Sequence, residues 1–300
     1  MKGELVSIVT GDGYELQGLL CTSSKPQTDD KTSFNKAILH IHGLAGNFYE
    51  NRFVSVVADE LNAHGYTFLT VNNRGSGVLS ELRKCTADGL ELVEVGGARE
   101  VFEDCLYDIQ AWINFLDSQG YSKIVLQGHS FGCYKVVFYQ SCRSDPRVKA
   151  LALISPPDVF GYQYAKYGGR FQSDLELAEK LVSKGKGTEF MPLEAYLYLI
   201  DANAFWRNLG PNSQMGILNY FDPQAPFTEL AQIGIPIFAC YGTVNEPVVK
   251  EPIECLEILK KKSVNSPKVK TVVVENATHR YLGHEKQLAL LIREWVNEAL

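Results

Sequence analysis

Short apolar runs alternate with stretches of helical spacing along most of this chain, and the alternation restricts the possible folds more than any other feature. The apolar runs lie at 37–41, 66–71, 124–126, 148–154, 235–240 and 269–274. Runs of this kind suit strands of a parallel sheet that is covered on both faces. Between them, apolar residues recur at helical spacing over 54–63, 101–116, 134–142, 253–259 and 287–300. The pattern predicts an α/β fold with a mostly parallel sheet.

The N-terminal segment has a different pattern. Apolar and polar residues alternate over 5–9 and 14–20, on either side of Gly-Asp-Gly at 11–13. Alternation around a glycine-rich turn is typical of an antiparallel hairpin. We therefore expect antiparallel N-terminal strands beside the parallel sheet.

The regular alternation lapses between about Pro156 and Leu230. This stretch is rich in Tyr, Phe and Trp, and its apolar spacing predicts helices at 173–184 and 193–200. We expect an α/β core formed by residues 1–155 and 231–300, with residues 156–230 inserted as a helical cap, or lid. For any single aromatic residue, packing inside the insertion is a simpler role than contact with a substrate.

Composition and charge exclude several classes of function. The 300 residues carry a net charge of −6, and Lys and Arg are scattered apart from three consecutive lysines at 260–262, so a nucleic-acid partner is not expected. No uncharged run approaches the ~20 residues that span a bilayer, so we expect no membrane association. The seven cysteines lack metal-ligand spacing and indicate reduced, buried thiols. These observations predict a cytoplasmic protein without a metal or an organic cofactor. They do not specify whether the protein is a monomer or an oligomer.

A strong chemical signal lies at residues 128–132, which read Gly-His-Ser-Phe-Gly. The motif follows the predicted strand 124–126 and precedes the predicted helix 134–142. A G-x-S-x-G sequence in this context is typical of a nucleophile elbow, a sharp turn that projects the serine hydroxyl above the sheet. The same five residues could also occur in an ordinary surface turn, but the flanking strand and helix favour the elbow. We predict that Ser130 is a nucleophile.

A serine nucleophile needs backbone N–H donors for the oxyanion that develops on its substrate. One donor is expected from Phe131, which follows the nucleophile at the start of a helix. The second is expected from Leu44 in the His-Gly-Leu-Ala-Gly loop at 42–46. His42, at the end of a predicted strand, is better explained as a structural residue that orients this loop.

The base should lie in the loop after the last strand. His279 has that position, because it follows the apolar run 269–274 and precedes the final helical segment. His284 is the nearby rival, but it lies closer to the start of the final helix and is interpreted as a surface residue or as a residue that supports the site without taking part in the reaction. We predict that His279 activates Ser130.

The acid of the triad is less clear from the sequence. A carboxylate is expected about three residues after a glycine at the end of the penultimate core strand. That glycine is Gly242, and the expected position holds Asn245. Asn245 could orient His279 without neutralising it, Glu246 could reach the histidine instead, or Asp158 could supply the carboxylate; an original Asp could also have been replaced. We take Asn245 as the orienting residue and keep both carboxylates as alternatives.

The motifs together resemble the α/β-hydrolase superfamily and, within it, the bacterial branch related to the fungal siderophore-esterase-like group. The similarity covers nearly the whole chain and rests on segments 42–43, 72–77, 128–132, 185–187, 191–192, 277–279 and 283–285. It implies an α/β-hydrolase fold, Ser130 and His279 as nucleophile and base, and Leu44 and Phe131 as oxyanion donors. In the family the acid would be an Asp at position 245, so this chain departs from the pattern there.

The expected reaction is hydrolysis of a carboxylic ester of a small-molecule acyl substrate through an acyl-enzyme on Ser130. Two alternatives remain open at this stage. The acyl group could come from an amide or thioester, or could pass to an amine or alcohol in a biosynthetic pathway. The chain could instead be a non-catalytic ligand-binding protein with a degenerate triad, and Asn245 is the feature that favours this reading.

Overall fold

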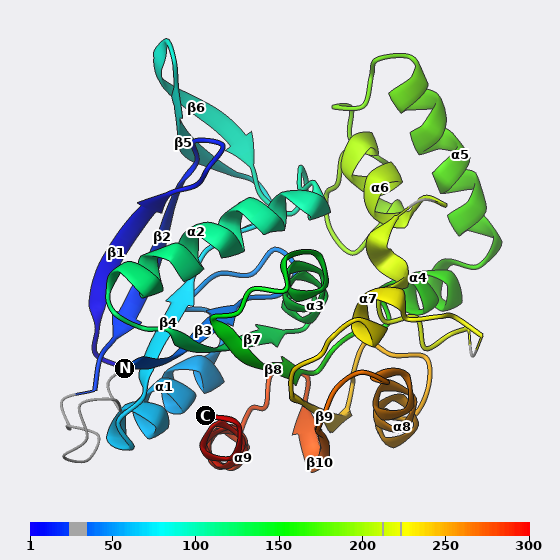
Figure 1. Ribbon diagram of the computed structural model, residues 1–300. Helices are drawn as coiled ribbons and strands as arrows, with labels where there is room; N and C mark the ends of the chain where they lie inside the picture. Colours follow the sequence, from blue (N-terminus) through cyan, green and yellow to red (C-terminus); the bar gives the residue numbers. More distant parts are fainter. Residues whose placement is uncertain (24–34, 212, 223) are drawn as a thin grey trace.

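A single eight-stranded sheet forms the centre of the computed structural model, which describes residues 1–23, 35–211, 213–222 and 224–300. Its strand order is β1-β2-β4-β3-β7-β8-β9-β10 (Figure 1). The first two strands pair antiparallel, β2 pairs antiparallel with β4, and every pair from β4 to β10 is parallel. The strands are β1 (Glu4–Val9), β2 (Glu15–Cys21), β3 (Lys36–Ile41), β4 (Thr67–Val71), β7 (Lys123–His129), β8 (Val148–Ile154), β9 (Ile237–Val244) and β10 (Val269–Thr278). The predicted mostly parallel sheet with antiparallel N-terminal strands is confirmed.

Helices cover both faces of the sheet, as the apolar runs require. They are α1 (Arg52–Ala63), α2 (Cys105–Ser118), α3 (Gly132–Arg143), α4 (Val159–Tyr167), α5 (Gly169–Ser183), α6 (Ala202–Leu209), α7 (Thr228–Ala231), α8 (Pro252–Lys262) and α9 (Glu285–Ala299). The 3-10 helices are η2 (Phe102–Asp104), η3 (Leu193–Ala195) and η4 (Gln214–Gly216). None of the helices in the described part of the chain has both the length and the apolar character that crossing a bilayer demands.

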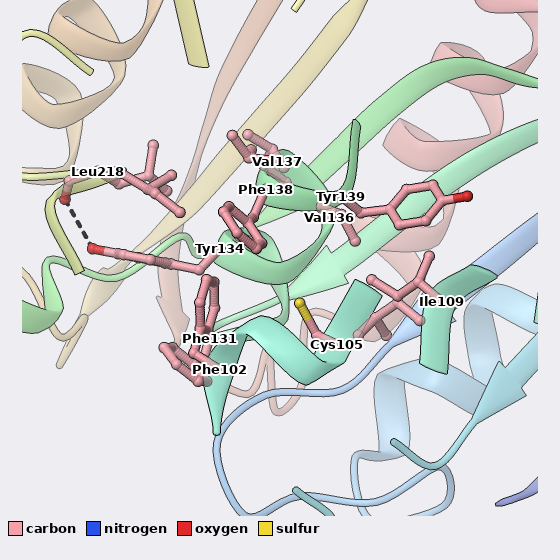
Figure 2. Packing of buried hydrophobic residues seen from close by; sticks show 14 of the residues in the cluster. Phe102, Cys105, Ile109, Phe131, Tyr134, Val136, Val137, Phe138, Tyr139 and Leu218 are labelled. Atoms are coloured by element: carbon pink, nitrogen blue, oxygen red, sulfur yellow. Dashed lines mark hydrogen bonds between the residues drawn. The ribbon is translucent and has the colours of Figure 1, made fainter. Parts of the chain in front are cut away.

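Two hydrophobic cores lie on opposite sides of the sheet. On one side, α1 and α9 pack through residues such as Phe53 and Trp295 against β3, β7, β8 and β9. On the other side, α2, α3 and α8 share a core with the inserted helices, and Figure 2 shows part of it around α3. Five of the seven cysteines are buried as expected, whereas Cys85 and Cys142 are exposed.

The chain between β8 and β9, called the insertion below, contains the helices α4 to α7, which lie on the side of the molecule away from β1 and β2 (Figure 1). The segment 97–100 of the core attaches to this insertion. Arg99 forms an ion pair with Asp201 at 2.8 Å, and the Asp201 N–H donates to the carbonyl of Ala98 at 2.9 Å. The Asn208 amide donates to the carbonyl of Glu100 at 3.4 Å.

One helix predicted for the insertion is wrong. The expected helix at 193–200 is reduced to η3, because the segment closes into a loop. The Met191 N–H donates to the Ile200 carbonyl at 2.9 Å, and Phe190 forms a bridge with Asp201. Tyr196 is accordingly extended, with φ −143° and ψ 177°. A loop whose two ends pair with each other cannot also continue as a helix.

A two-stranded sheet formed by β5 (Ser80–Thr86) and β6 (Gly89–Val95) was not expected from the sequence. It projects from the body of the molecule (Figure 1) and is tied to the N-terminal hairpin by a bridge between Tyr14 and Lys84. A signal was available in the two-residue Ala-Asp turn followed by glycine, although only β5 alternates in exposure and β6 is mostly exposed.

A buried arginine joins the loop after β4 to α2 and the N-terminal hairpin. The Arg74 guanidinium is 6% exposed and pairs with Asp108 at 2.7 Å, Asp12 at 2.8 Å and Asp104 at 3.1 Å. Asp108 is also buried and accepts the Arg74 backbone N–H at 2.8 Å. Two buried, oppositely charged groups in this geometry depend on each other, because either one alone would be a desolvated charge.

Replacing Asp108 with alanine should therefore destabilise the protein strongly. We expect a loss of about 3 kcal/mol or more in the free energy of unfolding, because the buried Arg74 loses its closest partner. Asp104→Ala is the matched control, and it should lose about 1 kcal/mol because Asp104 is a third exposed. Urea unfolding measures both values, and equal losses in the two variants would contradict this account.

Candidate active site

Ser130 lies at the turn between β7 and α3, where strand becomes helix. Its φ of 54° is in the left-handed region that non-glycine residues rarely adopt. The backbone is held there by the Ser130 N–H, which donates to Ile154 at 2.9 Å, and by the Cys133 N–H, which donates to the Ser130 carbonyl at 2.8 Å. This is the strained turn that the G-x-S-x-G motif predicts, and strain of this kind is stored at functional sites.

Glycines make the turn possible because other backbone segments pass within contact distance. A Cβ at Gly43 would lie 2.8 Å from the Ser130 Cβ and 3.3 Å from its Oγ. A Cβ at Gly132 would collide with the carbonyl oxygens of Ile41 and His42, and one at Gly128 would collide with the Gly132 backbone. The loop after β3 is thus pressed against the nucleophile.

The sheet register brings the two segments together. Ile41 of β3 is paired with Gly128 of β7, so both strands end at the same level. Leu44 is half-buried in the loop that follows β3, and Phe131 is buried at the start of α3. Both residues line one pocket with Ser130. The two residues predicted to supply oxyanion donors therefore line the same pocket as the serine.

His42 orients this loop and takes no part in a proton relay. Its Nδ1–H donates to the Gly43 carbonyl at 2.7 Å, while its Nε2 accepts the Asn73 N–H at 3.3 Å. Complete burial lowers the pKa of His42 to about 3, so the ring stays neutral, as these two hydrogen bonds require. This geometry agrees with the structural role that the sequence favours.

The His279 side chain is paired with Glu246. Its Nδ1 lies 2.6 Å from Oε2 of Glu246, a carboxylate that is 1% exposed, whereas the imidazole is 23% exposed. With Nδ1–H donating to the carboxylate, Nε2 is left as the basic nitrogen. Glu246 is in turn fixed through Oε1, which accepts the Gly242 N–H and the Ser155 hydroxyl, each at 2.8 Å.

The sequence-based choice of Asn245 as the orienting residue does not agree with this geometry. Asn245 is exposed and has φ 56°, and the carboxylate that faces His279 belongs to the next residue. A left-handed residue reverses the chain direction locally, and asparagine tolerates that conformation better than most residues. The turn places Glu246, with its longer side chain, where a carboxylate three residues after the glycine was expected.

His129 is a functional neighbour that the sequence did not single out. Its Nε2–H donates to the backbone carbonyl of His279 at 2.9 Å, and the two rings lie 4.9 Å apart. Burial lowers the pKa of His129 well below its usual value, so it acts as a neutral donor. Because His129 precedes Ser130 directly, this bond joins the nucleophile turn to the segment that carries the base.

His284 stands apart from this arrangement. It forms the N-terminal boundary of α9, and its Nδ1 lies 3.4 Å from the Leu282 carbonyl.

Across the described residues, no group of three or more His, Cys, Asp or Glu side chains is arranged to hold a metal ion.

The pocket beside Ser130 is narrow, with a volume of about 70 Å³. The insertion supplies much of its wall, with both core and inserted residues contributing apolar surface. The lining residues are Leu44, Ser130, Phe131, Pro157, Asp158, Val159, Tyr162, Gln163, Tyr196, Leu197 and Pro247. Sites for drug-sized ligands have volumes of ~300 Å³ or more. Only a slender group fits this pocket as it stands.

Comparison with known proteins agrees with the fold. A family model described as alpha/beta hydrolase fold matches residues 36–192, more than half of the chain. The chain belongs to the α/β hydrolase family. No match is found among curated proteins by sequence.

Several solved structures share the fold of this α/β hydrolase. Est1E from Butyrivibrio proteoclasticus, solved with bound ferulic acid, is 18% identical with a TM-score of 0.64, covering 98% of this chain and 99% of that one. An esterase from Pyrococcus furiosus is 16% identical with a TM-score of 0.58, covering 99% and 88%. An esterase domain from Rhodothermus marinus is 15% identical with a TM-score of 0.58, covering 99% of both chains.

Asp158, the other alternative acid, has a different place in this α/β hydrolase. It is buried at the start of α4, where its Oδ1 accepts the Gly161 N–H at 2.9 Å. Burial raises the pKa of its carboxyl to about 6. Asp158 lines the pocket, but its carboxyl serves as a helix cap, and no contact with His279 is found among the described residues.

Glu246→Gln should lower kcat by about 10⁴, because a neutral amide cannot stabilise the imidazolium that forms when His279 takes a proton. Asn245→Gly is the matched control at the adjacent position. Glycine keeps the positive φ, so kcat should change little. Steady-state hydrolysis of a p-nitrophenyl ester measures both. If Asn245→Gly were the crippled variant and Glu246→Gln the active one, the assignment of the acid would be overturned.

Asp158→Asn should change how stability depends on pH. The pKa of Asp158 is raised in the folded protein from 3.8 to about 6, so its contribution to stability is present below about pH 4 and is lost as the pH rises through 6. The amide has no such dependence and still caps α4. Relative to wild type, the variant should gain up to about 3 kcal/mol between pH 4 and pH 7.5. Urea unfolding at both pH values checks this, and parallel pH profiles would count against it.

Proposed function

We propose that this α/β hydrolase cleaves a carboxylic ester of a small acyl compound through an acyl-enzyme on Ser130. The observation that carries the proposal is the 2.6 Å contact between His279 Nδ1 and Glu246 Oε2. Glu246 gives His279 the negatively charged partner that an asparagine could not provide. Its place in the sequence, between Ser130 and His279, matches the order of nucleophile, acid and base that this fold uses. The alternative of a degenerate, non-catalytic protein rested on Asn245, and the contact with Glu246 favours the catalytic proposal over it.

The reaction has two steps. In the first, Ser130 Oγ attacks the ester carbonyl while His279 Nε2 takes the hydroxyl proton, and the imidazolium is stabilised by Glu246. The N–H groups of Leu44 and Phe131 donate to the oxyanion. His279 then gives its proton to the leaving alcohol as the ester C–O bond breaks. In the second step, His279 activates water, which releases the acid and restores Ser130.

The pocket favours a flat or slender acyl group. Its walls include Phe131, Tyr162, Tyr196 and Leu197, and its volume is about 70 Å³. Est1E, which has the same fold, binds ferulic acid, a planar aromatic acid. An aryl or short acyl ester is therefore the substrate class that we propose. Residues 156–230 would act as the cap that closes over it.

Placement in the branch related to the siderophore esterases is also part of this proposal. Its support is the set of motifs in the loops, including His42-Gly43 and the Asn-Asn-Arg-Gly-Ser-Gly segment at 72–77. In the structure these two segments meet, because the Asn73 N–H donates to His42. The proposed roles of the site residues do not depend on this branch. The branch adds only the expectation that the substrate is an ester.

Covalent labelling with a fluorophosphonate tests the nucleophile. Wild type should label at Ser130, and Ser130→Ala should not label at all. His279→Ala should label at least about a thousandfold more slowly, because the hydroxyl then has no base. Ser183→Ala, which removes a serine at the far end of α5, serves as the control and should label like wild type. Folded wild-type protein that fails to label would contradict the proposal.

The fate of the acyl group separates hydrolysis from transfer. Wild type is supplied with an aryl ester, with and without a competing alcohol or amine, and the products are identified by mass spectrometry. Free acid as the sole product supports hydrolysis. An acylated acceptor as the main product would reassign the enzyme as an acyltransferase that uses the same Ser130 intermediate.

A further inference from the structure

A buried ion pair lies directly behind the nucleophile turn and takes no part in the reaction described above. Lys135, on α3, is fully buried, and its Nζ contacts Oε1 of Glu100, which is itself buried. The same Nζ donates to Oδ1 of Asn73 at 2.9 Å and lies 5.3 Å from the centre of the Phe131 ring. Lys135 therefore lies beside Phe131, which follows Ser130, and contacts Asn73, which donates to His42.

The pair is connected to the loop after β3 through Asn73. The Asn73 side chain is held by Lys135, while its backbone N–H donates to His42, whose Nδ1–H donates to the Gly43 carbonyl. Gly43 is the residue in contact with Ser130, and Leu44 follows it. Four successive contacts thus lead from Glu100 to the Gly43–Leu44 peptide unit, which carries the Leu44 N–H.

Stability alone is a poor explanation for this arrangement. Burying two charges costs free energy that their mutual attraction only partly offsets, and apolar replacements of such pairs are often as stable. Glu100 Oε2 and Asn73 Nδ2 also have no hydrogen-bond partner among the described residues, which adds to the cost. Gly75 accommodates the pair, because a Cβ there would collide with the Glu100 carboxylate.

We propose that Lys135 and Glu100 are positioning residues that hold the Gly43–Leu44 turn at the distance from Ser130 at which the Leu44 N–H can bind the oxyanion. The inference rests on the proposed function and adds a reason for the buried charges. A displacement of about 1 Å at a reacting centre can cost a hundredfold in rate. A rigid link made of directional hydrogen bonds prevents such a displacement better than apolar packing does.

The decisive variant replaces both charges, Lys135→Met with Glu100→Leu, so that no unpaired charge stays buried. We expect it to fold, with KM close to that of wild type and kcat lower by about ten- to a hundredfold, since oxyanion binding contributes to the transition state. A trifluoromethyl ketone, whose adduct with Ser130 carries an oxyanion, should bind more weakly by a similar factor. A variant that had lost only packing would not show a selective loss of affinity for this inhibitor.

The control variant removes a charge pair at the opposite end of α3. Asp145 and Arg147 are paired at 2.7 Å beyond the last turn of that helix. Asp145→Leu with Arg147→Met should lower the melting temperature and leave kcat and inhibitor affinity unchanged. If the Lys135/Glu100 double variant does not fold, Glu100→Gln decides, because it keeps the shape and one acceptor and should lower kcat without raising KM.

Hydrogen exchange provides a test that does not depend on catalysis. In the double variant, amides of the loop at 42–46 should exchange at least tenfold faster than in wild type, and in the control variant they should not. If the fluorophosphonate does not label Ser130 in wild type, the proposed function is contradicted. The exchange rates of the loop amides still test whether Lys135 and Glu100 hold the loop in place. Unchanged exchange in the loop together with unchanged kcat would overturn the inference.

Discussion

The close approach of the β3 loop to the turn at Ser130 determines how the rest of the site can be built. A side chain at Gly43, Gly128 or Gly132 would force these backbone segments apart. Because β3 and β7 pair in register up to Ile41 and Gly128, the sheet brings the segments together and the glycines allow them to meet. The strained φ of Ser130 persists because its N–H donates to Ile154 at the end of β8 and its carbonyl accepts the Cys133 N–H in the first turn of α3.

Neutral histidines carry much of the organisation around this contact. His42 and His129 are fully buried, and burial lowers both pKa values, so each ring has a fixed donor and acceptor at physiological pH. His42 hydrogen-bonds the loop that contacts Ser130, and His129 hydrogen-bonds the backbone of His279. His279, which is partly exposed and paired with Glu246, is the histidine with a nitrogen left for chemistry.

Much of the fold was predictable because buried parallel strands and amphipathic helices leave strong patterns. The strained turn at Ser130 and the position of His279 after β10 were also predictable, since a motif or a strand end marks each one. The acid was not, because its position depends on the left-handed turn at Asn245, a property of backbone geometry that residue counting misses. The loop at 191–200 was missed because the pairing of Met191 with Ile200 outweighs a helical spacing of apolar residues.

The segment 97–100 holds the insertion through Ala98, Arg99 and the carbonyl of Glu100, while the side chain of Glu100 points into the core and meets Lys135. The proposed cap and the proposed oxyanion loop therefore depend on one short stretch of chain. The insertion is consequently not an exchangeable module. Foreign helices grafted between β8 and β9 would have to form the same contacts with segment 97–100. Without those contacts, the graft would displace Glu100 and with it the loop that contacts Ser130.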